Sequence, residues 1–69
     1  MEDPTIHLKK FIKLHNYKYI IIHKISNNKY SIWCPNPLPQ LLYEYIHKTY
    51  YVTFCSEDYL EFNEFNEIL

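Results

Sequence analysis

The chain contains no glycine, and this absence limits both the turns it can make and the chemistry it can perform. Without glycine, asparagine is the residue that most readily adopts a positive backbone φ angle, so a tight turn is expected where asparagines cluster. Glycine-rich phosphate-binding loops and the nucleophile elbow of hydrolases are excluded. Arginine is also absent, which excludes bidentate phosphate clamps and arginine fingers. We therefore expect a protein that is not an enzyme.

The segment Ser26-Asn27-Asn28-Lys29 separates two stretches of alternating apolar residues, residues 17–25 and 30–34. Alternation with a period of two is typical of strands, and the Asn-Asn pair favours a hairpin with a two-residue loop. One face of this hairpin is then apolar. Its expected cross-strand pairs are Ile25 with Tyr30, His23 with Ile32 and Ile21 with Cys34.

Three further segments have apolar residues at helical spacing, namely residues 4–15, 39–48 and 57–68. Asp3 precedes the first segment and Ser56 precedes the third, and both residue types are good N-caps. We therefore expect three helices, of which the third is acidic on its outer side.

Residues 49–55 are mostly β-branched and aromatic, which predicts a third strand. The expected order is α-β-β-α-β-α in a single α+β domain that covers residues 1–69 and has no evident internal repeat. Ile20 and Ile22 make the second face of the 17–25 strand apolar as well. That strand is therefore expected at the centre of a three-stranded sheet, with the helices mainly on one face.

The charges are divided between the two ends of the chain. Residues 1–29 contain six Lys against two acidic residues, whereas residues 30–69 contain one Lys against six acidic residues. Carboxylates along the expected third helix resemble a row of phosphates, and such a surface could block a protein that binds nucleic acid. The alternative is a solvated outer face. The expected partner-binding residues are Glu57, Asp58, Glu61, Glu64 and Glu67, together with Trp33.

A second interpretation uses the basic end of the chain. Lys9, Lys10 and Lys13 share one side of the first helix, and Tyr17 and Tyr19 follow it. Lysines contact phosphates and tyrosines stack on single-stranded bases, so these five residues are the candidate nucleic-acid site. Three lysines without arginine form only a small basic surface for contacts with phosphates, however. We therefore expect a host protein rather than a nucleic acid as the partner.

The remaining reactive residues do not predict a cofactor. Cys34 and Cys55 are expected to be reduced and buried in strands, with a disulfide or metal role as the alternative. No CxxC or HxxxH spacing occurs, so no metal and no cofactor are expected. No apolar run approaches the ~18 residues of a membrane span, and the N-terminus lacks the order of a signal peptide. We expect a cytoplasmic protein that does not contact membranes.

The seven Lys, nine Ile, six Asn and eight Tyr use AT-rich codons, which are typical of phages, other mobile elements and viruses. We therefore expect a small non-enzymatic interaction protein from such a source that binds and inhibits a host macromolecule. The most specific version of this prediction is that the target is a nucleic-acid-acting defence or repair enzyme, which the acidic helix contacts. The alternatives are a nucleic-acid-binding regulator and a homo-oligomeric structural protein, such as a homodimer, that uses the exposed Trp33 face.

Overall fold

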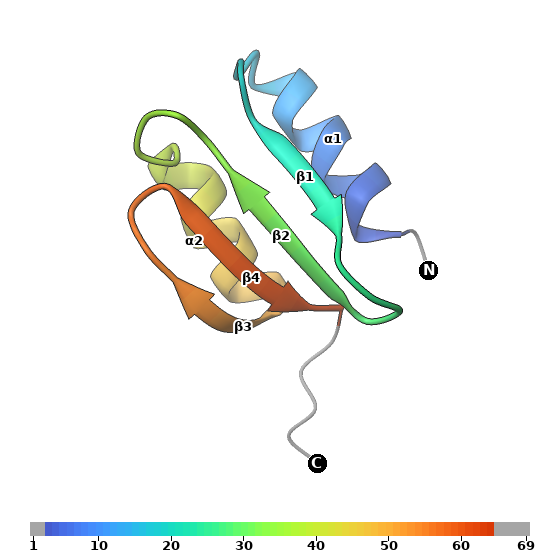
Figure 1. The fold of residues 1–69 in the computed structure, drawn as a ribbon. Helices are drawn as coiled ribbons and strands as arrows, with labels where there is room; N and C mark the ends of the chain where they lie inside the picture. Colours follow the sequence, from blue (N-terminus) through green and yellow to red (C-terminus); the bar gives the residue numbers. More distant parts are fainter. Residues whose placement is uncertain (1–2, 65–69) are drawn as a thin grey trace.

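The computed structural model describes residues 3–64, which form two helices and one four-stranded sheet. The elements in chain order are α1 (Pro4–Leu14), β1 (Ile21–Lys24), β2 (Lys29–Trp33), α2 (Gln40–Thr49), β3 (Tyr51–Cys55) and β4 (Tyr59–Asn63). The strands lie in the order β1-β2-β4-β3, and each neighbouring pair is antiparallel. Both helices lie on one side of this sheet (Figure 1), as expected, and no described element covers the other side.

The core lies between the two helices and the inner strands β2 and β4. Tyr30 and Ile32 alternate with polar residues in β2, and Leu60 and Phe62 do the same in β4, so all four side chains point toward the helices. Leu8 of α1 and two residues of α2 are fully buried against these strands, and two residues of the β2–α2 loop complete the cluster. The buried hydrophobic cluster is Leu8, Tyr30, Ile32, Cys34, Leu38, Leu42, Ile46, Leu60 and Phe62.

Helix α1 begins where its capping signal predicts. The Asp3 carboxylate accepts a hydrogen bond from the backbone N–H of Thr5 at 2.8 Å, which satisfies a donor that the first helical turn leaves free. The same carboxylate lies 3.9 Å from Lys24 Nζ at the end of β1. Asp3 therefore connects the start of α1 to the hairpin as well as capping the helix.

The cap makes a testable contribution to the pH dependence of stability. The hydrogen bonds from the Thr5 hydroxyl and backbone N–H, assisted by the charge of Lys24, lower the pKa of Asp3 below its ordinary value. A carboxyl whose pKa is lowered by folding stabilises the fold above its unfolded-state pKa, and loses this effect as the pH falls through the folded-state value. Asp3→Asn keeps a capping oxygen but removes the charge. We expect Asp3→Asn to unfold at a lower temperature than wild type at pH 7, with the gap closing below about pH 4.

Thermal unfolding followed by circular dichroism at pH 7, 5, 4 and 2.5 measures this gap. Asp3→Ala is the companion variant because it removes both the cap and the charge, and it should be the less stable of the two at every pH. A gap between wild type and Asp3→Asn that stays constant from pH 7 to 2.5 would contradict the assignment.

The hairpin predicted around residues 26–29 is confirmed, but its register is shifted by one residue. Ile22 pairs with Ile32 and Ile21 pairs with Trp33 rather than with Cys34. The backbone N–H groups of Ile25 and Ser26 both donate to Lys29 O, at 2.8 and 3.2 Å. The loop therefore contains three residues. A two-residue loop of type I′ needs two positive φ angles, and the positive φ angles of the described residues lie elsewhere, at Asn16 and Tyr19.

The one-residue shift reverses the faces of β1. Ile22 now faces the core with Tyr30 and Ile32, whereas Ile21 and His23 face away from the helices. Strand β1 is also shorter than the predicted 17–25 strand, because the left-handed backbone of Tyr19 interrupts the extended chain before Ile21. It lies at an edge of the sheet and not at its centre.

The helix predicted for residues 57–68 is wrong over the described residues. Residues 59–63 form β4 instead, which enters the sheet between β2 and β3. Leu60 and Phe62 face the core while Glu61 lies on the opposite side, which is the two-residue alternation of a strand. The observed order is therefore α-β-β-α-β-β with four strands. Residues 65–68 of the predicted helix lie outside the described residues.

The fold contains a repeat that the sequence does not reveal. Each helix is followed by a hairpin, and the strands of the second unit begin thirty residues after their counterparts, at Tyr51 rather than Ile21 and at Tyr59 rather than Lys29. The second strands of the two units, β2 and β4, pair at the centre of the sheet. Both hairpin turns begin with a serine, Ser26 and Ser56. The two units share little else in sequence, so only their arrangement shows the relationship.

Candidate functional site

The sheet side opposite the helices, hereafter the open face, is the main candidate site. It carries the residues of each strand that alternate with the core residues. Three of its large apolar side chains are exposed to solvent, Phe54 by 54%, Ile21 by 47% and Trp33 by 39%. On a small folded domain, apolar side chains gathered on one side usually mark an interaction surface.

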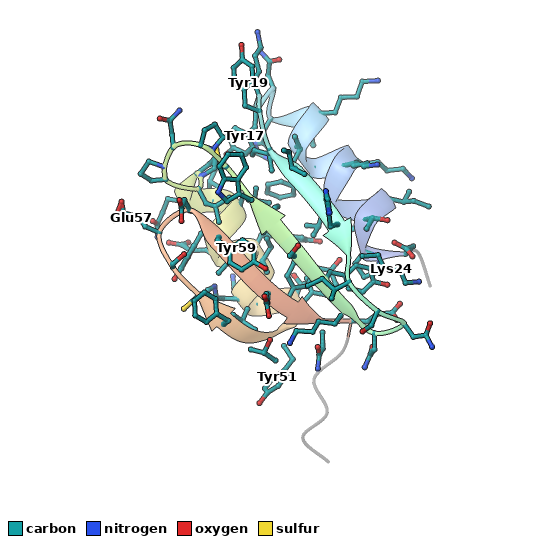
Figure 2. All side chains as sticks on the ribbon, viewed as in Figure 1. Tyr17, Tyr19, Lys24, Tyr51, Glu57 and Tyr59 are labelled. Carbon is teal, nitrogen blue, oxygen red and sulfur yellow. The ribbon has the colours of Figure 1, made fainter. Side chains whose placement is uncertain are left out.

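Four of these residues form a continuous row across the sheet, hereafter the aromatic band. Ile21 pairs with Trp33, and Trp33 pairs with Tyr59 on the next strand. The Tyr59 ring lies 6.0 Å from the Phe54 ring on β3. The band therefore crosses all four strands near the end of β2. Figure 2 shows Tyr59 in front of the sheet, on the side away from the helices.

A bulge in β3 places Phe54 in this band. Val52 pairs with Phe62 and Phe54 pairs with Glu61, so Thr53 is an extra residue without an opposite partner in β4. Unbroken alternation from Val52, which packs against the core, would turn Phe54 to the helix side. The extra residue turns it to the open face instead, which is a common use of a bulge near a functional surface.

The polar centre of the open face is internally paired. The Glu61 carboxylate accepts a hydrogen bond from the Tyr59 hydroxyl at 2.6 Å and lies 3.2 Å from Lys29 Nζ. These two contacts lower the pKa of Glu61, and the same hydrogen bond raises the pKa of Tyr59. Glu61 and Lys29 cancel each other's charge, so the central part of the open face is formally neutral.

A hollow of about 430 Å³ lies at the end of the sheet beside the aromatic band, hereafter the loop hollow. It is formed by the β2–α2 loop and the β3–β4 turn, which two backbone hydrogen bonds join: Cys34 N to Asp58 O at 3.0 Å and Leu38 N to Glu57 O at 2.8 Å. Its lining residues are Pro35, Asn36, Pro37, Ser56, Glu57 and Asp58. Trp33 and Tyr59 directly adjoin these segments in the chain, so the hollow and the band lie at the same end of the sheet.

The predicted acidic partner-binding residues do not form one row. Glu57 and Asp58 lie in the β3–β4 turn on the loop hollow, and Figure 2 shows Glu57 at the rim of the molecule. Glu61 lies on the open face in contact with Lys29. Glu64 follows β4, where its backbone N–H donates to Asn28 O at 3.1 Å. Glu67 lies outside the described residues, and the helix expected to align all five is absent from the part described.

The candidate nucleic-acid residues are also not brought together with the aromatic band. Lys9, Lys10 and Lys13 belong to α1, which packs on the side of the sheet opposite the open face. Tyr17 is half-buried, with its ring 5.5 Å from that of His15. Tyr19 is exposed in the loop before β1, where Figure 2 shows it extending away from the sheet. The band residues Ile21, Phe54 and Tyr59 were missed, although alternation in Tyr59–Asn63 was a usable signal for Tyr59.

The described residues, 3–64, do not form a cluster of His, Cys, Asp or Glu that could hold a metal ion. Cys34 is buried as expected, whereas Cys55 is exposed, and both are free thiols. Neither described helix has the length and apolar character to cross a membrane.

Comparison with known proteins finds no matching family model, no matching curated protein and no matching solved structure. The function therefore has to be argued from the surface itself.

Proposed function

We propose that this chain is a small non-enzymatic interaction domain that binds another protein through its open face. The observation that carries the proposal is the aromatic band, whose apolar side chains cross all four strands on the side without helices. Trp and Tyr are the residue types that most often contribute binding energy at protein interfaces. Trp33, which was expected to bind a partner, lies in the middle of this band.

The charge of the surface favours a protein over a nucleic acid. Lys29, at the start of β2, extends its ammonium group over the open face, and Glu61 already pairs with it. The nearby turn adds Glu57 and Asp58, which repel phosphates. A neutral apolar band bordered by carboxylates is therefore better suited to a protein surface.

The experiment is a quantitative pull-down that compares two pairs of apolar deletions. Ile21→Ser with Phe54→Ser removes exposed apolar groups from the open face. Leu14→Ser with Leu41→Ser is the matched control on the helices, where these side chains are 82% and 58% exposed. We expect a partner that wild type and the control recover equally, and that the open-face variant recovers at least about ten-fold less, as for loss of interface anchors.

Equal recovery of every partner by the open-face variant would contradict the proposal, provided that circular dichroism shows that variant to be folded. If instead the helix variant alone lost the partner, the binding surface would lie on the helices.

Binding of single-stranded nucleic acid is the second candidate, because aromatic residues on an open antiparallel sheet also serve as platforms for unpaired bases. The lysines of α1 do not contribute to this face, so the platform lacks a basic track. We expect no retardation of a 12-nucleotide oligothymidylate in a gel shift at low salt. A salt-dependent shift that Phe54→Ser abolishes would favour this candidate over a protein partner.

Inhibition of a host enzyme and an origin in a phage, mobile element or virus remain predictions. The version based on an acidic helix loses its physical support, because the described carboxylates lie in a turn, on a strand and at a strand end. The open face supports the proposal of an interaction domain. The residues next to the aromatic band then indicate which kind of partner it binds.

A further inference from the structure

We propose that the occupant of the open face is a short basic segment of a partner protein, with an apolar side chain on the aromatic band and a Lys or Arg in the loop hollow. This inference rests on the proposed function, and it specifies the partner's chemistry. Its basis is the position of an apolar row and an acidic hollow at the same end of the sheet.

The aromatic band supplies the apolar half of the site. Its four residues come from four different strands, so their spacing is set by the sheet and requires no rearrangement on binding. Tyr59 is held by its hydrogen bond to Glu61. Three strand spacings of about 4.8 Å make the band roughly 14 Å long. That length matches an extended segment of about four or five residues at ~3.3 Å each.

The loop hollow supplies the charged half of the site. Glu57 and Asp58 line it, and no ion pair within residues 3–64 involves either carboxylate. The Ser56 hydroxyl donates to Asp58 Oδ1 at 3.2 Å and thereby orients that carboxylate. Pro35 and Pro37 also line the hollow. A guanidinium or ammonium group is the complementary occupant, since it pairs with the carboxylates while its apolar stem packs on the prolines.

The dimensions of the open face argue against a second copy of this chain as the occupant. Four strands about 4.8 Å apart and five residues of ~3.3 Å each give a flat face of roughly 320 Å². A stable protein interface buries about 800 Å² on each partner. The face is therefore small for a dimer but sufficient for a short segment.

The test is selection of random 12-residue peptides displayed on phage against the immobilised wild-type chain. We expect enriched sequences to place Lys or Arg within a few residues of an aromatic or aliphatic residue, and to be depleted in Asp and Glu. The most enriched peptide is then synthesised and titrated by calorimetry at 50 and 500 mM NaCl. We expect its affinity for wild type to fall several-fold at the higher salt.

Matched variants test separately whether the loop hollow and the aromatic band contribute to the affinity for the peptide. Glu57→Gln should weaken the peptide about ten-fold and reduce the salt dependence, whereas Phe54→Ala should weaken it about ten-fold with the salt dependence retained. Glu44→Gln is the control, because Glu44 is an exposed acid on α2 that accepts a hydrogen bond from Gln40 at 2.7 Å and does not line the hollow. It should leave the affinity unchanged.

Each other outcome overturns the inference in a recognisable way. Enrichment of neutral or acidic peptides that require Phe54 would refute the basic segment and leave the proposed function intact. Enriched peptides that bind Phe54→Ser as well as wild type would count against both. Absence of any enrichment would refute a short segment, and the pull-down would then decide the proposed function. A wild-type dimer in analytical ultracentrifugation that Phe54→Ser converts to monomer would identify a second copy as the occupant.

Discussion

Replacement of Phe62 by alanine is expected to unfold the domain. Phe62 is fully buried in β4, and its ring lies 5.8 Å from that of Tyr30 and 5.1 Å from that of Tyr50. Truncating a buried phenylalanine to alanine lowers the free energy of unfolding by about 3–5 kcal/mol. A core in a chain this short supplies only about 3–5 kcal/mol of net stability. The variant should therefore lose most or all of its cooperative transition in urea, followed by circular dichroism at 25 °C.

Phe54→Ala is the matched control for this prediction, because it makes the same chemical change on the open face, where Phe54 is largely exposed. It should change the free energy of unfolding by less than about 1 kcal/mol, as is usual for surface positions. If Phe54→Ala destabilised the chain as much as Phe62→Ala does, the assignment of the two faces of the sheet would be wrong.

Ser31→Pro should also prevent folding, because Ser31 lies in an inner strand. Strand β2 pairs with β1 on one side and with β4 on the other, where Ser31 is opposite His23 and Glu61. Proline has no N–H to donate and is found essentially only at sheet edges or bulges. The lost hydrogen bond interrupts the backbone pairing at the centre of the sheet, whether its partner strand is β1 or β4. Two-dimensional ¹H–¹⁵N NMR should show the poorly dispersed signals of an unfolded chain.

Thr53→Pro also removes a backbone N–H, but at a position where proline should be tolerated. Thr53 is the extra residue of the bulge in the edge strand β3, and the substitution removes the hydrogen bond that its hydroxyl donates to Glu61 O at 3.3 Å. We expect this variant to keep a dispersed spectrum with a modestly lower unfolding temperature. The reverse outcome, with Ser31→Pro folded and Thr53→Pro unfolded, would place β2 at the edge of the sheet and β3 inside it.

These two pairs of variants bear directly on the proposed site. If the Phe62 and Ser31 variants unfold while the Phe54 and Thr53 variants fold, then Glu61 and the aromatic band lie together on the side away from the helices. Weaker binding by the Phe54 variants then reflects the missing aromatic ring and not an unfolded chain.

Signals within a few residues of one another were sufficient for part of this fold. Asp3 and Pro4 predicted the start of α1, alternation around Ser26–Lys29 predicted the hairpin, and the content of residues 49–55 predicted β3. Each of these depends on capping, turn chemistry or side-chain alternation, which act between near neighbours in the chain. The exposure of Trp33 was predicted for the same kind of reason, because its strand face was expected to have no helix over it.

The tertiary structure decided the conformation of residues 59–63, the register of the hairpin and the order of the strands. Tyr59 and Phe62 are three residues apart, as on one side of a helix, while Leu60 and Phe62 alternate as in a strand, so this short segment is compatible with both structures. Strands β2 and β3 lie on its two sides and exchange backbone hydrogen bonds with it, and no local pattern contains that information. The joining of Phe54, Tyr59 and Trp33 into one band depends on the same long-range pairing and on a bulge. The sequence by itself therefore determined which residues are apolar and which are charged, and only the pairing of distant strands decided which of them share a surface.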